Sequence, residues 1–327
     1  MNNYPRIQTG FTLIELMIAM LLGLLLTGAL LTMLAQARVS FQQDEFYARM
    51  LDESRFAMRE LSRDVSMAGY IGDIMVPGVI DLDSSLAIDE DCERADGESF
   101  AYRLTDSVSG VDTSLISLDN ITTAAATAEF GCLDASELVA GTDIVAVKKL
   151  SGAPATALQV GDVALRNNGT VGALFVEPID AAIPAPFEDR LYTPAIYFIR
   201  NYTETVGDDN PALCRKILIG GATATMETEC IAAGIENLQV EYGIDLNGDG
   251  SVDRYLPDPT DLELAGAVSA RLYLLARTPD EERSYTNDKT YSISNSDDFE
   301  PADSFRRRVY TTTVNMLNKR NRQVTGI

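Results

Sequence analysis

The sequence of 327 residues contains no histidine, and this absence narrows the chemistry that the protein can perform. Catalytic triads and zinc sites that depend on imidazole are excluded, and so are most schemes of general acid–base catalysis. The sequence also has no Walker loop, no Gly-x-Ser-x-Gly turn and no glycine-rich dinucleotide motif. We therefore expect a protein that is not an enzyme.

Basic residues are scarce as well. The 26 lysines and arginines face 49 aspartates and glutamates, so the formal net charge is −23. Because contacts with phosphate groups require clustered positive charge, we expect no nucleic acid partner. The basic residues that do cluster lie near the C-terminus, at Arg306, Arg307, Arg308, Lys319, Arg320 and Arg322. They could contact an acidic neighbouring subunit, or they could flank a surface strand.

A long apolar run spans residues 11–35, and its only charged side chain is Glu15. The segment before it, residues 1–10, is polar and has no apolar core of its own. A secretory signal has its apolar core before the cleavage site and loses it on processing. Here the apparent cleavage point follows Gly10, so the mature chain would keep the apolar run as a membrane helix.

The six residues from Gly10 to Glu15, Gly-Phe-Thr-Leu-Ile-Glu, resemble the class III signal of type IV pilins and pseudopilins. The resemblance implies that residues 1–10 are a leader peptide, that a prepilin peptidase cuts after Gly10, and that the new N-terminal Phe11 is methylated. It also implies that Glu15 acts in assembly by pairing with the N-terminal amine of a neighbouring subunit. A carboxylate within a membrane helix costs roughly 3 kcal/mol or more if unpaired, which favours a partner. The alternative is a glutamate at the membrane interface of a plain single-pass anchor.

The helix is expected to continue beyond the membrane. From residue 36 to residue 68 apolar residues recur with three-four spacing, and charged residues fill most other positions. No proline occurs between Phe11 and Pro77, and Gly69 and Gly72 stand where the pattern ends. We expect one transmembrane and assembly helix over residues 11–68, roughly 85 Å long, whose second half packs on a globular domain. A coiled-coil stalk is the alternative, although strict heptads are absent.

Residues 69–327 are expected to form one β-rich globular domain of antiparallel strands, which makes the fold class α+β. Alternate residues from Val268 to Ala276 are apolar, as in an antiparallel sheet with one solvated face. The runs with strand character are residues 144–147, 195–200, 217–219, 238–242, 268–276 and 309–317.

The four cysteines form an even set in a domain expected outside the cytoplasm, which indicates disulfide bonds. No Cys-x-x-Cys spacing points to a metal or redox site. Of three possible pairings we favour the local one, Cys92 with Cys132 and Cys214 with Cys230. The second pair brackets a sequence that is typical of a β-hairpin.

A metal site is expected between two strand-like segments. Five residues match positions 1, 3, 5, 7 and 9 of an EF-hand-type calcium loop: Asp245, Asn247, Asp249, Ser251 and Asp253. The glycine at position 6 also fits. Position 12 is a leucine, so the bidentate glutamate is missing. We predict calcium as a cofactor; the alternative is an Asn-Gly/Asp-Gly turn whose acids face water.

Three further segments, residues 63–72, 235–242 and 268–277, look like PilW-type minor pilins. The resemblance implies a minor pilin that primes assembly of a type IV pilus with other minor pilins and the major pilin, and stays near the fibre tip. A large tip adhesin is a further expected partner. Before assembly the chain would cross the inner membrane once, with its globular domain in the periplasm; afterwards it would lie in the pilus at the cell surface. The alternatives are a minor pseudopilin of a type II secretion system and a tip adhesin or ligand-binding module.

Overall fold

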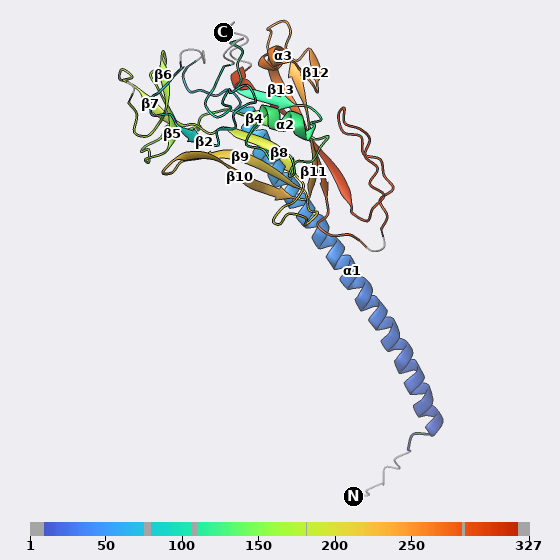
Figure 1. Ribbon diagram of the computed structural model, residues 1–327. Coiled ribbons are helices and arrows are strands. Elements are labelled where there is room, and N and C mark those ends of the chain that lie inside the picture. The colour runs from blue at the N-terminus through green and yellow to red at the C-terminus, as the bar shows by residue number, and fades with distance from the viewer. Residues whose placement is uncertain (1–9, 75–79, 106–109, 181, 283–284, 320–327) are drawn as a thin grey trace, which may run out of the picture. The chain divides into compact units, whose positions relative to one another are not determined.

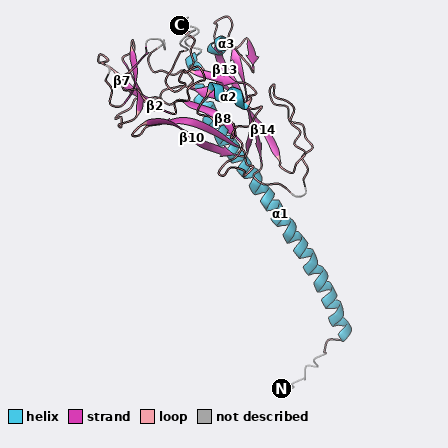
Figure 2. Cartoon of the chain, viewed as in Figure 1, coloured by secondary structure: helices cyan, strands magenta, loops and turns pink. Residues whose placement is uncertain are grey.

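The computed structural model describes residues 10–74, 80–105, 110–180, 182–282 and 285–319 (Figure 1). The expected leader therefore lies outside the described residues except for Gly10, as do Arg320 and Arg322. The chain divides into two compact units, residues 1–48 and 49–327. The fold is α+β, because a long apolar N-terminal helix is followed by strands that all belong to the second unit (Figure 2).

Helix α1 (Leu13–Ser66) crosses the boundary between the units and is two residues shorter at each end than the sequence predicts. It ends in tightened bonds, in which the amides of Met67 and Ala68 donate to carbonyls three residues earlier. Gly69 follows with a φ of 72°, a left-handed conformation that glycine adopts without strain. The breakers identified in the sequence thus end the helix where the apolar pattern stops.

In the second unit, one face of α1 enters the main hydrophobic core. Met50, Ala57, Leu61 and Val65 recur every seven, four and four residues, and all four are buried. They share a cluster with apolar residues of two different sheets. Full burial of a leucine stabilises the fold by about 1.5–3 kcal/mol, so this stripe anchors the end of the helix firmly.

A six-stranded sheet packs against this stripe. Its strand order is β2-β10-β9-β8-β4-β3, and all neighbours are antiparallel except β2 and β10. The strands are β2 (Ile88–Asp89), β3 (Leu115–Leu118), β4 (Ile144–Val147), β8 (Ala195–Arg200), β9 (Ala212–Ile219) and β10 (Ala224–Ala233). Tyr197 and Ile199 of β8 enter the core with α1, whereas Ile196 and Phe198 enter a second core on the other face. Because both faces are covered, β8 reads as a continuous apolar run.

The second core also contains the short helix α2 (Thr123–Glu129), which is capped by the side chain of Thr122. A four-stranded sheet of order β1-β6-β5-β7 forms a third apolar cluster with Ile71 and Ile74. Its strands are β1 (Ile80–Leu82), β5 (Val163–Asn167), β6 (Gly172–Val176) and β7 (Glu188–Leu191). These elements add layers that the sequence does not reveal.

The last sheet has the order β12-β11-β13-β14 and is antiparallel throughout. Its strands are β11 (Ile235–Ile244), β12 (Arg254–Leu256), β13 (Ala267–Arg277) and β14 (Arg307–Asn315), and the short helix α3 (Asp261–Ala265) precedes β13. The predicted alternation in β13 is observed, with Ala270, Leu272 and Leu274 in the main core. The opposite face is only partly solvated, because Leu275 packs with Tyr291 and Ile293 of the segment that connects β13 to β14.

Candidate functional site

The N-terminal site is built around a helix cap that sequence analysis missed. Thr12 immediately precedes α1, and its amide and hydroxyl donate to Oε2 of Glu15 over 2.9 and 2.8 Å. The amide of Glu15 donates in return to the hydroxyl of Thr12 over 3.3 Å. This reciprocal pattern is a capping box, whose Thr-x-x-Glu signature is readable from the sequence alone. It satisfies two of the amides that a helix start leaves without partners.

The cap changes how the charge of Glu15 is accommodated. One carboxylate oxygen, Oε2, accepts both bonds from Thr12. Within the part of the chain that the structure describes, the other oxygen, Oε1, has no hydrogen-bond partner. The carboxylate is therefore half satisfied by its own chain, and one oxygen remains able to accept from a second molecule.

Gly10 and Phe11 lie before the helix, where the peptide bond between them is outside regular structure. A Cβ atom added to Gly10 would have nothing within 4 Å, so the fold itself does not require a glycine there. Phe11 is 90% exposed, and the apolar side chains that follow it along the first unit are exposed too. Among the described residues, α1 is the one helix that is long and apolar enough to cross a membrane.

The Asp/Asn-rich segment forms the loop between the antiparallel strands β11 and β12. Asp245 directly follows β11, is 3% exposed and accepts hydrogen bonds from the amides of Asn247, Gly248 and Gly250. Burial opposes ionisation of Asp245, but these amide donors outweigh it and lower the pKa of the carboxyl group. Gly248 and Gly250 have φ of 78° and 82°, backbone conformations that residues with a side chain rarely adopt.

Three of the four remaining candidate ligands also accept hydrogen bonds from the loop backbone, whereas Ser251 is exposed and only its amide takes part, as a donor to Asp249. The side-chain oxygens of Asn247 and Asp249 accept from the amides two residues later, and Asp253 accepts from the amide of Leu246. The described residues contain no group of three or more His, Cys, Asp or Glu side chains placed to hold a metal ion. Oxygen donors suit calcium chemically. The calcium site therefore stays a prediction from spacing.

The structure contains both disulfide bonds of the favoured pairing, Cys92–Cys132 and Cys214–Cys230. Cys214 on β9 lies opposite Cys230 on β10, so the bond clamps the open end of this hairpin as the sequence predicts. Cys92 is buried in the second core, where the bond ties the 80–105 segment to the segment after α2. Both bonds are structural.

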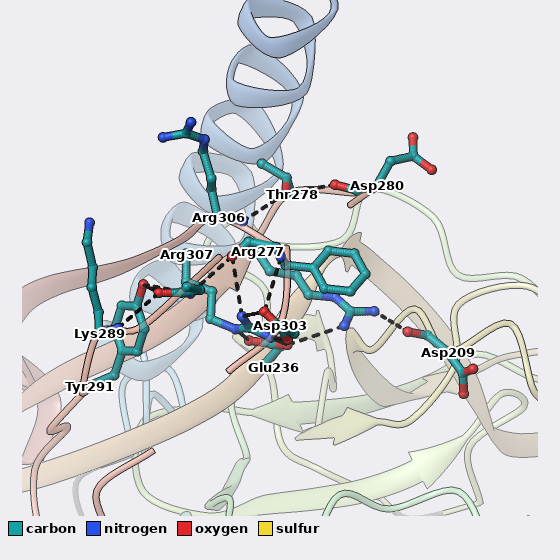
Figure 3. Close-up of polar contacts among 12 residues, drawn as sticks. Asp209, Glu236, Arg277, Thr278, Asp280, Lys289, Tyr291, Asp303, Arg306 and Arg307 are labelled. Carbon is teal, nitrogen blue, oxygen red and sulfur yellow. Dashed lines mark hydrogen bonds and ion pairs between the residues drawn. The ribbon is translucent and has the colours of Figure 1, made fainter. Parts of the chain in front are cut away.

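The basic residues that cluster near the C-terminus do not all lie at the surface. Arg307 begins β14, and its side chain is 2% exposed and forms ion pairs with Glu236 on β11 and Asp303 at 2.5 and 2.6 Å (Figure 3). Arg277 on β13 joins the same glutamate at 3.4 Å. Hydrogen bonds from Arg307 lower the pKa of Asp303, whereas burial lowers the pKa of Arg277. A surface role is wrong for Arg307, because its charge closes a buried network across three strands.

Lys319 is also buried and does not lie at the surface. Its side chain is 1% exposed, and its ammonium group lies 3.4 Å from a carboxylate oxygen of Asp112. Arg306 is partly exposed and forms an ion pair with Glu282. Of the described basic residues near the C-terminus, Arg308 fits a surface position on β14. The sequence gives no signal that separates these roles, because they depend on which strand faces each side chain.

Comparison with known families gives two matches. Residues 196–318 match the model of the family described as Type IV Pilus-assembly protein W, and residues 5–31 match the prokaryotic N-terminal methylation motif. The first match contains β8 to β14 with the Asp/Asn-rich loop, and the second contains Gly10, Phe11 and Glu15. No curated protein and no solved structure matches the chain. The two matches confirm the resemblance to PilW-type pilins that the sequence motifs predict.

Proposed function

We propose that this type IV pilus-related pilin is a minor pilin that joins other minor pilins in the inner membrane and primes assembly of the fibre. The observation that carries the proposal is the pairing of two family matches in one chain, the methylation motif at residues 5–31 and PilW at residues 196–318. Pilin-family domains are structural, so we assign the chain no catalytic step.

Processing fits the geometry at the start of the chain. The bond between Gly10 and Phe11 precedes the cap residue Thr12, so a prepilin peptidase would meet an exposed segment without regular structure. Cleavage there would leave the exposed apolar side chains of the first unit as the membrane anchor. The globular unit would then lie in the periplasm before assembly.

The two carboxylate oxygens of Glu15 support the proposed role in assembly. Oε2 is held by Thr12, and Oε1 can accept from the N-terminal amine of Phe11 on a neighbouring subunit. Such an ion pair gains strength in lipid, where no water competes with it. The apolar side chains around it would exchange lipid for neighbouring helices as the subunit enters the fibre.

The test is deletion of the gene, followed by counting surface pili by electron microscopy and measuring protein secretion in the same strain. We expect few or no pili with normal secretion, and restoration by the intact gene but not by a Glu15→Ala variant that is processed and accumulates normally. Normal pili with secretion substrates retained in the periplasm would instead assign the chain to the pseudopilins of a type II secretion system.

Location in the fibre needs a separate measurement. Gold-labelled antibodies against the globular unit should bind at fibre ends if the chain primes assembly and remains at the tip. Labelling along the whole fibre would contradict the tip position, although not membership of the pilus. Loss of surface labelling after deletion of another minor pilin would identify that protein as a partner.

A further inference from the structure

A cavity of about 500 Å³ lies in the globular unit, and no residue of the Asp/Asn-rich loop lines it. Its walls come from the segment before β4, from β11 and β13, and from the loop of residues 291–299. This volume is within the range of small-molecule sites, roughly 300–1,000 Å³. None of the proposed assembly residues lines it.

Three sets of contacts fix the position of the 291–299 loop. Tyr291 and Phe299 exchange backbone hydrogen bonds of 2.9 and 3.0 Å, which close the base of the loop. Ile293 is 2% exposed and packs on Leu275 of β13. Asn295 donates to Asp119 over 2.9 Å, which fastens the tip to the segment that follows β3. The cavity wall is therefore preformed.

The cavity is lined by side-chain amides in fixed orientations. The buried amide of Gln239 donates to the carbonyl oxygens of Asn120 and Asn237 over 3.2 and 3.1 Å. This arrangement leaves the Nδ2 group of Asn237 as a donor with no partner among the residues that the structure describes. In the same described part, Oδ1 of Asn295 and the carboxylate of Asp297 are acceptors without a hydrogen-bonded donor. The wall thus offers both donors and acceptors.

The charge of the lining disfavours an anionic ligand. Glu236 lines the cavity, but its charge is neutralised by ion pairs with Arg277 and Arg307 (Figure 3). No lysine or arginine is among the described residues that line the cavity, whereas Asp297 and Asp298 are. An anionic ligand would be repelled by these carboxylates. Phe299, 38% exposed, adds an aromatic side chain to the lining, and the guanidinium of Arg307 lies 5.2 Å from the centroid of its ring.

We infer that this cavity is a binding site for a neutral saccharide. A pyranose ring has an apolar C–H face, which Phe299 can cover, and a rim of hydroxyl groups that both donate and accept hydrogen bonds. Asn237, Asn295 and Asp297 supply the complementary acceptors and donors from two directions. The inference does not depend on the assembly role, because the cavity is formed within residues 120–299 alone.

The test uses the full chain in detergent and the methyl glycosides of glucose, galactose, mannose and N-acetylglucosamine as probes. Titration calorimetry should detect saturable binding of at least one glycoside, with a dissociation constant of about 1 mM or lower. Asp297→Asn and Phe299→Ala should each weaken this binding at least about ten-fold. Near-ultraviolet circular dichroism checks that both variants are folded, and the conservative Asp297→Asn substitution alone suffices if the other variant is not.

Asp288→Asn is the matched control, because Asp288 is exposed on the same connecting segment and does not line the cavity. Its glycoside affinity should equal that of the unchanged chain. The inference is overturned if no probe saturates, or if binding survives both cavity variants. Saturable binding of the diamine cadaverine without glycoside binding would also overturn it, since the cavity would then select cations.

Discussion

The hydroxyl group of Tyr197 lies 2.8 Å from Oδ2 of Asp64 and ties strand β8 to helix α1 inside the main core. Lys149 approaches the other oxygen of Asp64 at 3.3 Å, and Arg215 donates to the tyrosine hydroxyl over 3.3 Å. Burial, followed by the nearby charge of Asp64, raises the pKa of Tyr197, so the phenol stays a donor. The helix thus carries a buried charge that the sheet satisfies.

Tyr197→Phe removes one donor from this buried carboxylate. We expect the free energy of unfolding to fall by about 1–3 kcal/mol, because Asp64 would keep its burial and lose a partner. Thermal and denaturant unfolding of the purified chain measure the change. Tyr192→Phe is the matched control, since the hydroxyl of Tyr192 is buried and has no hydrogen-bond partner among the described residues. Equal losses in the two variants would contradict the role of the Asp64 contact.

The burial of Lys148 should make the stability of the folded chain depend on pH. Its ammonium group is buried, donates to Thr113 over 3.2 Å and lies 4.6 Å from the ring centroid of Phe100. Burial lowers the pKa of Lys148 to about 7 in the folded chain, against about 10.4 in an unfolded one. Between these values the unfolded state binds more protons, so stability should rise with pH by at most about 1.4 kcal/mol per unit.

The check is the thermal midpoint between pH 7 and pH 9. Lys148→Met should remove most of the rise that the unchanged chain shows over this interval. Lys289→Met, at an exposed position, should leave the rise intact. A Lys148→Met variant with an unaltered pH dependence would show that the buried ammonium group is not its source.

Replacement of Gly10 separates folding from processing. Because a Cβ at Gly10 would meet nothing within 4 Å, Gly10→Leu should leave the fold and the thermal midpoint unchanged. The prepilin peptidase should nevertheless fail to cut, and mass spectrometry should find an intact leader and an unmethylated Phe11. Normal maturation of this variant would refute the assignment of the cleavage site.

The two disulfide bonds should contribute unequally. They close sequence separations of 40 residues for Cys92–Cys132 and 16 residues for Cys214–Cys230. Loop-closure entropy predicts losses of about 4 and about 3 kcal/mol when each pair is replaced by alanine. The difference grows if removal of Cys92 also loosens the second core, to which it contributes. Unfolding in denaturant measures both losses, and a larger loss for the hairpin pair would contradict the entropic argument.

We propose calcium binding by the β11–β12 loop on the spacing of its oxygen ligands, with an affinity of about 10⁻⁴ to 10⁻³ M. Calcium at about ten times the dissociation constant should then stabilise the folded chain by about 1.4 kcal/mol, and a chelator should remove the effect. Asp253→Asn should abolish the response, because it removes a charge while keeping an acceptor for Leu246. Asp288→Asn, at an exposed position outside the loop, is the control. A thermal midpoint that is indifferent to calcium would remove the site.

The parts of the fold that sequence predicts best are those with unambiguous periodicity. Residues 144–147 and 195–200 coincide with β4 and β8, since a strand buried on both faces is an apolar run with polar ends. The hairpin of β5 and β6 is not among the predicted strands, although Asn168-Gly169 joins the two. In the structure Asn168 accepts from the amides of Thr170 and Val171, which is a turn signal that the sequence contained.

Some of the candidate sites can be predicted from local sequence patterns, and others cannot. Glu15 and the cysteine pairs follow from local patterns, and the cap at Thr12 is equally local, because its Thr-x-x-Glu signature lies in the first turn. The buried position of Arg307 and the cavity beside Asn237 could not be predicted. Both depend on contacts between β11 and segments about 60–70 residues away, and the order of strands in a sheet is not written in any local spacing.

The cap at the start of α1 uses no atom that precedes the Gly10–Phe11 bond. Its donors and acceptor belong to Thr12 and Glu15, and both residues lie after Gly10. Under the proposed cleavage after Gly10, maturation would create a positive amine one residue ahead of a helix start that is already complete, and the helix would not have to be rebuilt when the leader departs. The newly cut subunit would be competent to pair as soon as it is released from the peptidase, with no folding step between cleavage and insertion into a growing fibre.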